Sequence, residues 1–435
     1  MEKPSPQGEA PKPILRRPAL LNGVECSHVY QCTNSWNRGL AMYDFDRIID
    51  RHNTFSAKWN VLDNELPMWV ADMDFETAPE ILDVIKARAA HGVFGYNDIP
   101  DRWNEAICSW WKRRHCFAME PENLVFCTGV IAALSSIVRK FTTPAEKIVL
   151  QSPVYNCFCN SIENNGRLVL RSRLSIGDGS YCMDFDDLEE KFADPQTAMM
   201  VLCNPHNPVG RIWSASELRQ VGELAAKYNV LVVSDEIHCD LTDPGYSYVP
   251  YASVSPQCAE NSITLIAPTK TFNLAGLHTA AIYAQNPKLR HRAWRAVNTD
   301  EVGEPGTFAI EAAVAAYEQG DAWLDELREY VTANKQLVHE MLAKKLPQAE
   351  ITPSHATYLL WVNLGNRIND VAEFCKQLRK ETGLWITPGT VYGPPSQTQG
   401  YVRINIACPK AYVEDGMTRL IKGYNSYTSA WGISL

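Results

Sequence analysis

Lys270 lies in a stretch of sequence, TLIAPTKTFNLAGL (264–277), that is too apolar for an ordinary surface lysine. Burial disfavours the charged ammonium, so a lysine in such a place either pairs with an acid or loses its proton. A neutral amine is a nucleophile whose natural partner is an aldehyde, with which it forms a Schiff base. Because Lys270 follows a strand-like run, and Pro268 and Gly276 shape the loop around it, the pattern predicts a reactive lysine at the carboxyl end of a strand.

Two further polar residues follow strand-like runs. Asp235 ends the run in VLVVSDEIH, where a carboxylate can cap the next helix, form a core salt bridge or face a buried cation. Asn207 lies in CNPHNPVGRIW, where two Asn-Pro pairs and a glycine predict an extended turn. The residue either serves only to form this tight loop, or its amide reaches a ligand oxygen.

Three other residues each allow a structural and a functional interpretation. Gly129, in FCTGVIAAL, lies at a strand-to-helix junction, where free N–H groups can bind an anion, although the stretch is not a G-x-G-x-x-G motif. Tyr155, in SPVYNCF, either packs at a strand end or stacks on a planar cofactor. Arg403, inside the apolar run YVRINIAC, needs a partner, which is either a structural carboxylate or the carboxylate of a substrate.

The stretch DEIHCD could also be interpreted as a metal cluster of Asp235, His238, Cys239 and Asp240. The spacing matches no strong zinc pattern, and H-E-x-x-H is absent from the chain. We therefore expect no metal.

Alternating strand-like and helix-like segments are expected to position these residues. Short runs that are apolar on both faces predict central strands of a covered, largely parallel sheet, at 124–127, 147–151, 199–203, 230–234 and 264–267. Helical spacing occurs at 130–141 and at 214–228, where Ser214 and Glu217 can form a capping box. After about residue 305 a long helical pattern at 321–346 and the strand-like ATYLLWVNL and YVRINIAC indicate a smaller α+β domain.

The composition excludes several classes of protein. The net charge of -9 and the lack of a basic block with interleaved aromatic residues argue against a nucleic-acid partner. No apolar run is long enough to span a membrane, and the opening MEKPSPQGEAPKP lacks the apolar core of a signal peptide. The 13 cysteines include no C-x-x-C pair, which favours a reducing compartment, and we expect a cytoplasmic protein.

Taken in order, these motifs resemble the pyridoxal-phosphate enzymes of the class I/II aminotransferase family. The stretches LPMWVADMDFETAPEI, HGVFGY, SPVYNCF, NPHNPVG, SDEIH, PTKTFNLAGL and VRINIACP are similar to its cystathionine β-lyase, or carbon–sulfur lyase, branch. The resemblance covers about residues 44–425 and implies an aspartate-aminotransferase-like fold of type I, with a large three-layer α/β/α domain and a smaller α+β domain. The resemblance implies an N-terminal segment packing with the small domain at 41–75, a large cofactor-binding domain at 76–305 and a small domain at 306–435. The tail at 1–40 has no counterpart in the family, and its prolines at 4, 6, 11, 13 and 18 predict that it is disordered.

The resemblance also implies a role for each site residue. Lys270 would hold pyridoxal 5′-phosphate as a Schiff base, and Asp235 would face the ring nitrogen. The ring would also be bound by Asn207 and His238 at its phenolic oxygen and by Tyr155 on its face. The phosphate would be bound by Gly129, Val130 and Thr269, and by Tyr96 of a neighbouring subunit, which implies a homodimer with shared active sites. Arg403 would bind the α-carboxylate of an amino-acid substrate.

Two positions depart from the common aminotransferase pattern. His278 stands where many aminotransferases have a phosphate-binding arginine, and Ala267 stands where many have a serine. These departures argue against an ordinary aminotransferase. The resemblance to the lyase branch implies an enzyme that cleaves cystathionine or cysteine S-conjugates by α,β-elimination to pyruvate, ammonia and a thiol. The alternatives are an amino-acid aminotransferase, a non-catalytic regulatory protein on the same fold and a ring-forming synthase acting on S-adenosylmethionine.

Overall fold

The structure is a computed structural model that describes residues 42–177 and 179–430. Its largest sheet has eight strands in the order β2-β9-β8-β7-β6-β3-β4-β5. Strands β3, β4, β6, β7 and β8 run parallel to their neighbours within this set. Strand β9 pairs antiparallel with both β8 and the edge strand β2, and β5 pairs antiparallel with β4 at the other edge. The bounds are β2 Leu124–Cys127, β3 Lys147–Ser152, β4 Leu168–Gly177, β5 Ser180–Met183, β6 Thr197–Cys203, β7 Leu231–Asp235, β8 Ser262–Ile266 and β9 Ala280–Tyr283.

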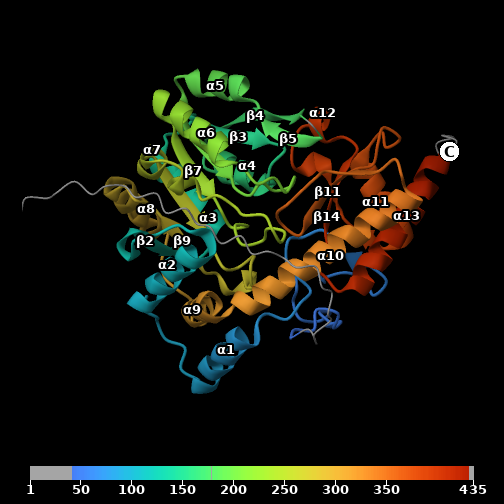
Figure 1. The fold of residues 1–435 in the computed structure, drawn as a ribbon, viewed down its shortest axis with the longest axis horizontal. Helices are drawn as coiled ribbons and strands as arrows, with labels where there is room; N and C mark the ends of the chain where they lie inside the picture. The colour runs from blue at the N-terminus through green and yellow to red at the C-terminus, as the bar shows by residue number, and fades with distance from the viewer. Residues whose placement is uncertain (1–41, 178, 431–435) are drawn as a thin grey trace, which may run out of the picture. The chain divides into compact units, whose positions relative to one another are not determined.

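Both faces of this sheet are covered by helices, as the doubly apolar strands predict (Figure 1). Side chains alternate along each strand, so Ile148 and Leu150 pack in one cluster and Val149 in the other. The first cluster includes residues of α3, α4 and α8, and the second includes residues of α5, α6 and α7. The bounds are α3 Val130–Phe141, α4 Asn156–Glu163, α5 Phe185–Ala193, α6 Ala215–Lys227, α7 Pro256–Glu260 and α8 Pro287–Thr299. The predicted capping box at Ser214 and Glu217 is present at the start of α6.

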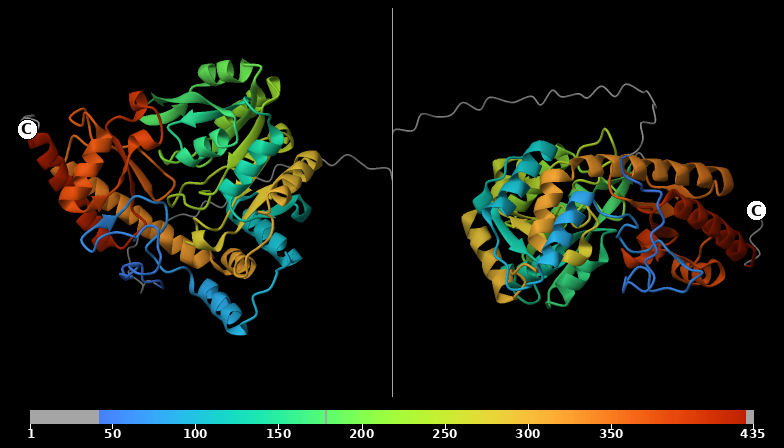
Figure 2. Two further views of the ribbon diagram at one scale, coloured as in Figure 1. Left: turned by 180° about the vertical axis from the view of Figure 1, so that it is seen from behind. Right: turned by 90° about the horizontal axis from the view of Figure 1, so that it is seen from below.

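A four-stranded antiparallel sheet follows in the order β10-β11-β14-β13. It is accompanied by α10, α11 and α13, and α10 lies beside α13 in both Figures 1 and 2. A separate parallel pair joins β1, from the start of the described chain, to β12. The bounds are β1 Leu66–Pro67, β10 Glu350–Ile351, β11 Leu359–Asn363, β12 Leu384–Trp385, β13 Thr387–Pro388, β14 Tyr401–Asn405, α10 Asp321–Lys345, α11 Val371–Thr382 and α13 Lys410–Ala430.

The remaining helices are short or connect these layers. They are α1 Pro79–His91, α2 Asp101–His115, α9 Ala309–Gln319, α12 Pro395–Thr398 and the 3-10 turns Pro121–Asn123, Tyr251–Ser253, Ala275–Leu277 and Gly389–Val391. None of the helices in the described ranges has both the length and the apolar character needed to cross a membrane.

The predicted α/β fold with a mainly parallel sheet is confirmed. The predicted tail at 1–40 falls among residues that the structure does not describe, and the predicted boundaries at 75 and 305 stay predictions. Within the large sheet, the sequence did not identify strands β4, β5 and β9. In β4 only Ser172 and Leu174 are buried, and both lie on the same face, so its residues do not form the doubly apolar run that revealed its neighbours.

Gly389, where the 3-10 turn Gly389–Val391 begins, is enclosed by backbone. A Cβ at this position would lie 2.6 Å from the carbonyl oxygen of Thr398 and 2.7 Å from that of Tyr401. We expect Gly389→Ala to lower the free energy of unfolding by about 1–3 kcal/mol, because backbone oxygens cannot rotate away. Urea denaturation would measure this, with Gly276→Ala as a control, since a Cβ at Gly276 meets no atom within 4 Å. Equal destabilisation by both substitutions would contradict the expectation.

Candidate active site

The carboxyl ends of the parallel strands bring most of the predicted site residues to one edge of the large sheet. Asp235 is the last residue of β7 and is paired in register with Cys203, the last residue of β6. Lys270 follows β8 by one turn, and Gly129 follows β2, which runs in the same direction. Residues that are far apart in the chain therefore converge, because parallel strands share the same edge for their carboxyl ends.

Lys270 is partly buried, and its Nζ donates a hydrogen bond to the carbonyl oxygen of Ala71 at 2.5 Å. Burial lowers the pKa of the Lys270 amine, the positive charge of Arg403 acts in the same direction, and Asp72 and Asp235 oppose it. The amine is thus held in a setting that favours its neutral, nucleophilic form.

Asp235 is buried, and its Oδ1 accepts a hydrogen bond of 3.1 Å from the backbone N–H of Ile237. Burial raises the pKa of this carboxyl to about 7, against the weaker effects of that hydrogen bond and of Lys270. No lysine, arginine or histidine of the described chain forms a salt bridge with it. The ionised form of this carboxyl would be stabilised most by a ligand that places a cationic group beside it.

His238 and Asn207 lie close to this pair. His238 is buried, its Nδ1 has no hydrogen-bond partner, and burial together with the charges of Lys270 and Arg403 lowers its pKa to about 3. The ring is therefore neutral at physiological pH and can serve a ligand oxygen only through an N–H group. Asn207 is buried, and its Oδ1 accepts a hydrogen bond of 3.2 Å from Arg403 Nη1, so its amide oxygen is already engaged.

Arg403 is buried in β14, in a cross-strand row with Trp361 of β11 and Thr387 of β13. Its Nη2 donates to the carbonyl oxygen of Trp69 at 2.8 Å, and its guanidinium lies 4.7 Å from the ring centroid of Tyr392. Its Nε has no partner, and no carboxylate in the described ranges forms a salt bridge with it. The structural salt bridge considered from the sequence is therefore not seen there, and the charge stays available for a carboxylate ligand.

Gly129 precedes α3 as its N-cap residue, so the first N–H groups of this helix have no acceptor within the helix. A Cβ added at Gly129 would meet no atom within 4 Å, which leaves open space at this helix N-terminus. Val130 and Thr269 are buried. Ala267 is buried, whereas His278 is exposed and has φ 52°, a left-handed conformation.

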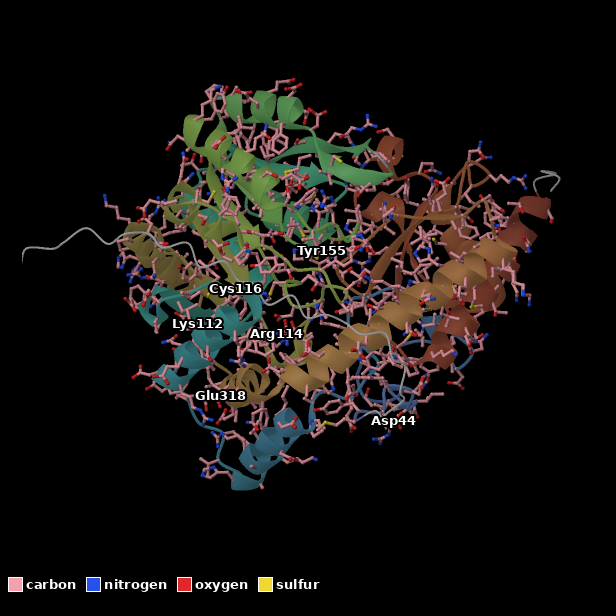
Figure 3. All side chains as sticks on the ribbon, viewed as in Figure 1. Asp44, Lys112, Arg114, Cys116, Tyr155 and Glu318 are labelled. Atoms are coloured by element: carbon pink, nitrogen blue, oxygen red, sulfur yellow. The ribbon has the colours of Figure 1, made fainter. Side chains whose placement is uncertain are left out.

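Tyr155 and Tyr96 have very different surroundings. Tyr155, labelled in Figure 3, is partly buried just before α4, and burial and its neighbour Cys157 raise its pKa. Tyr96 lies in the loop between α1 and α2 with its side chain fully exposed, at 100%. The structure thus does not bring Tyr96 to the cluster of its own chain, and its predicted contact with a neighbouring subunit stays a prediction.

The sequence-based search missed a group of residues around Ala71. Asp72 acts on the Lys270 amine, and Tyr358 donates a hydrogen bond of 3.3 Å to the same Ala71 carbonyl oxygen. The sequence signal was present in WVADMDF, which we used for the resemblance without assigning it a role. A backbone acceptor such as that of Ala71 leaves no trace in residue type, so only the structure reveals it.

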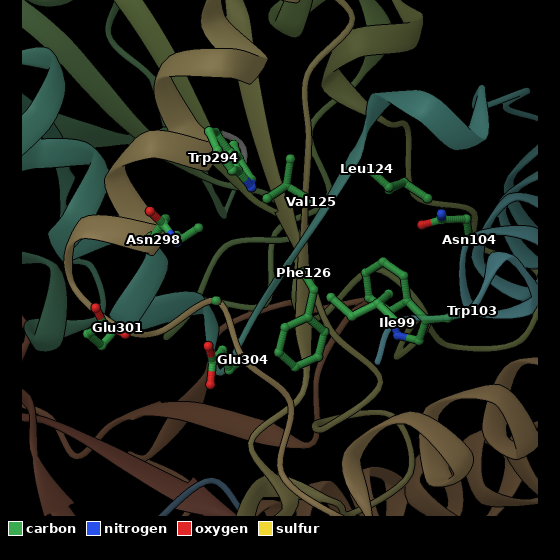
Figure 4. Close-up of a pocket in the computed structure, with 12 residues that line it drawn as sticks. Ile99, Trp103, Asn104, Leu124, Val125, Phe126, Trp294, Asn298, Glu301 and Glu304 are labelled. Atoms are coloured by element: carbon green, nitrogen blue, oxygen red, sulfur yellow. The ribbon is translucent and has the colours of Figure 1, made fainter. Parts of the chain in front are cut away.

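Two other features lie outside this cluster. His115, Cys239 and Asp240 could present ligand atoms within 4.8 Å of one another, but Asp240 already accepts hydrogen bonds from Trp110, His115 and Thr271 at 2.8–2.9 Å. A cavity of about 220 Å³, lined by residues of α2, β2 and α8, includes none of the predicted site residues (Figure 4).

Comparison with known proteins agrees with this arrangement. The family described as aminotransferase class I and II matches residues 65–420. The chain is 39% identical to cystathionine beta-lyase PatB of Bacillus subtilis, with 87% of this chain and 98% of that protein covered. It is 32% identical to protein MalY of Escherichia coli, with the same coverage of 87% and 98%. The structure of a C-S lyase from Staphylococcus hominis with bound pyridoxal phosphate superposes with a TM-score of 0.81 at 32% identity, covering 88% of this chain and 98% of that one.

The raised pKa of Asp235 predicts a pH effect on the ligand-free protein. The pKa is 3.8 for a free aspartate and about 7 here, so between these values the folded state binds more protons and the free energy of unfolding falls as pH rises. Asp235→Asn removes this contribution. The free energy of unfolding of the variant, taken relative to that of the unsubstituted protein, should therefore rise by on the order of 2 kcal/mol from pH 5 to pH 8.

Urea denaturation of both proteins at the two pH values would measure this gain. The buried Glu236 also has its pKa raised, to about 7, so the fall with pH persists in part in the variant. A stability difference between the two proteins that is the same at both pH values would contradict the assignment.

Proposed function

We propose that this chain, which belongs to the aminotransferase class I and II family, is a pyridoxal-phosphate-dependent carbon–sulfur β-lyase. It cleaves cystathionine or cysteine S-conjugates by α,β-elimination and releases pyruvate, ammonia and a thiol. The similarity to proteins named cystathionine beta-lyase and C-S lyase over nearly the whole of their lengths supports this reaction. Among the features of the structure, the buried Arg403 beside the Lys270 loop carries the argument that the substrate is an amino acid.

The residues at the sheet edge fit pyridoxal phosphate. Lys270 offers an amine with a lowered pKa, the buried Asp235 lacks a cationic partner, and the open space beside Gly129 leaves room for a phosphate at a helix N-terminus. Further groups that would hold the cofactor are Asn207 and His238 at its phenolic oxygen, Tyr155 at its ring face, Val130 and Thr269 at its phosphate, and Tyr96 of a second subunit. When bound, the cofactor supplies an electron sink that stabilises the carbanion at the substrate α-carbon.

The chain's own residues then bind the substrate and move one proton. Arg403 holds the α-carboxylate through the donors that no protein carboxylate occupies, and Tyr392 and Asn207 fix the orientation of the guanidinium. The Lys270 amine takes the α-proton, for which its lowered pKa suits it. The bond between Cβ and sulfur breaks, and the thiolate leaves with the bonding electrons. The thiolate takes up the proton that Lys270 holds and becomes the thiol, and the remaining 2-aminoacrylate takes up water to give pyruvate and ammonia.

We also propose a homodimer in which each subunit completes the site of the other. The loop that carries Tyr96 exposes Val93 and Phe94 as well, at 64% and 58%, so large apolar and aromatic side chains gather on this loop. Covering this loop with a second copy would bury these side chains and carry Tyr96 toward the partner's phosphate site. Buried cysteines such as Cys127, Cys203 and Cys258 are free thiols, which supports a reducing compartment such as the cytoplasm.

The reaction is tested by incubating the purified protein with cystathionine and a panel of cysteine thioethers, without any 2-oxo acid. We expect pyruvate and free thiol in equal amounts. Lys270→Ala should lower the rate by at least about 100-fold, because general base catalysis and the covalent anchor of the cofactor are both lost. Transfer of the amino group to an added 2-oxo acid, with no thiol released, would overturn the lyase and favour an aminotransferase.

The shared site is tested by mixing two inactive variants, Tyr96→Ala and Lys270→Ala. In a mixed dimer one of the two sites combines the intact Lys270 of one subunit with the intact Tyr96 of the other. After unfolding and refolding together, we expect about a quarter of the wild-type activity, because half of the dimers are mixed and each has one complete site. The refolded single variants serve as controls. Mixed dimers that form without any recovery of activity would contradict this assembly.

A further inference from the structure

The segment of residues 69–75, WVADMDF, lies between the lysine loop and the strand of Arg403, yet the proposed reaction gives its two aspartates no role. On one side, Arg403 donates to the carbonyl oxygen of Trp69, and Asn405 Nδ2 donates to the carbonyl oxygens of Val70 and Asp72, both at 2.6 Å. These bonds hold the backbone of the 69–75 segment against β14.

The same segment is bonded to the lysine loop. Lys270 Nζ donates to the carbonyl oxygen of Ala71 at 2.5 Å. The side chain of Asn273 accepts a hydrogen bond from the N–H of Met73 at 3.1 Å and donates to the carbonyl oxygens of Met73 and Phe75. The position of Asp72, next to Ala71, is thus fixed relative to the catalytic amine from both sides.

The two aspartates of the segment differ in how their charges are neutralised. Asp74 is buried, and its oxygens accept hydrogen bonds from Arg51, Lys58 and the Trp59 indole, each at 2.7 Å. The Asp72 carboxylate is more open, at 22% exposed, and it accepts two hydrogen bonds from one cation, Arg51, at 2.9 and 3.3 Å, with Lys58 further away at 3.5 Å. Asp72 therefore keeps more of its negative charge available to other neighbours.

One of those neighbours is Lys270. Charged and titratable groups act on its amine from several elements: Asp72 from the 69–75 segment, Arg403 from β14, Asp235 from β7 and Cys157 from α4. His238, which faces the amine from the loop after β7, is neutral because its pKa is lowered to about 3. Among these groups Asp72 is the strongest that raises the pKa of Lys270, and Asp74 is not among the charges that act most on it.

Tyr358, which lies beside Ala71, is also affected by the negative charge of Asp72. The Tyr358 hydroxyl donates to the Ala71 carbonyl oxygen, and after burial it is the negative charge of Asp72 that does most to raise the pKa of Tyr358.

We propose that Asp72 is a positioning residue of the reaction, whose carboxylate is the counter-charge of the Lys270 nitrogen. This nitrogen is positive both in its protonated Schiff base with the cofactor and as the ammonium that forms once the amine has taken the α-proton. The proposal rests on the cofactor part of the proposed function and does not depend on which bond of the substrate is cleaved.

The test is a pH titration of the visible absorption band of the cofactor-loaded protein, which reports protonation of the Schiff base. We expect Asp72→Asn to lower the midpoint by about one pH unit, since removing a nearby negative charge disfavours the protonated form. Asp74→Asn is the matched control, because it disturbs the same network and the same cations, and its midpoint should stay at the wild-type value. Asp72→Glu, which keeps the charge, should restore a midpoint close to that of the wild type.

A midpoint that Asp72→Asn leaves unchanged would overturn the proposal. An equal fall in the two asparagine variants would overturn it as well, because the effect would then come from disturbed packing of the segment. If Asp72→Asn does not retain the cofactor, Asp72→Ser gives a second neutral variant to which the same expectation applies. A wild-type protein that shows the band but releases no thiol leaves this proposal standing and overturns the lyase alone.

Discussion

The removal of ionisable side chains from water at the carboxyl edge of the large sheet is the constraint on which the rest of the site depends. Lys270, Asp235 and Arg403 are each partly or fully buried, and none of them forms a salt bridge within the described chain. A buried ionisable group without a partner lowers the free energy of unfolding unless a ligand supplies the missing partner. The shifts in the pKa of Lys270 and Asp235 follow from this arrangement, and so does the complementarity to a cofactor with a cationic ring and to a substrate with a carboxylate.

Two sheets supply the two halves of this arrangement. The large parallel sheet places its strand ends beside one another, and the small antiparallel sheet aligns Arg403 with Trp361 and Thr387 in one row. Neither sheet can fix the distance between the lysine and the arginine by itself. The backbone of the 69–75 segment does so, since Trp69 binds Arg403 and Ala71 binds Lys270 through carbonyl oxygens two residues apart.

Much of this could be predicted from residue types. Lys270, Asp235 and Gly129 end or follow apolar runs, and a parallel sheet brings such positions together whatever their separation in the chain. Strand β4 was missed because most of its side chains are exposed or only partly buried, and the role of Ala71 was missed because a carbonyl group is common to all residues. The influence of Asp72 on Lys270 depends on how Arg51 and Lys58 share their charge between two aspartates, and such a division has no counterpart in local sequence.

Gly129 and Gly389 show how differently two glycines can be required. Gly389 is surrounded by carbonyl oxygens, so the folded chain itself excludes a side chain there. At Gly129 the backbone is extended and a Cβ would meet no protein atom within 4 Å, so the fold would accept an alanine there. A descendant of this chain that no longer needed its cofactor could therefore lose Gly129 while retaining Gly389. The pair of positions gives a simple way to recognise, from sequence, a copy that has kept the architecture after giving up the chemistry.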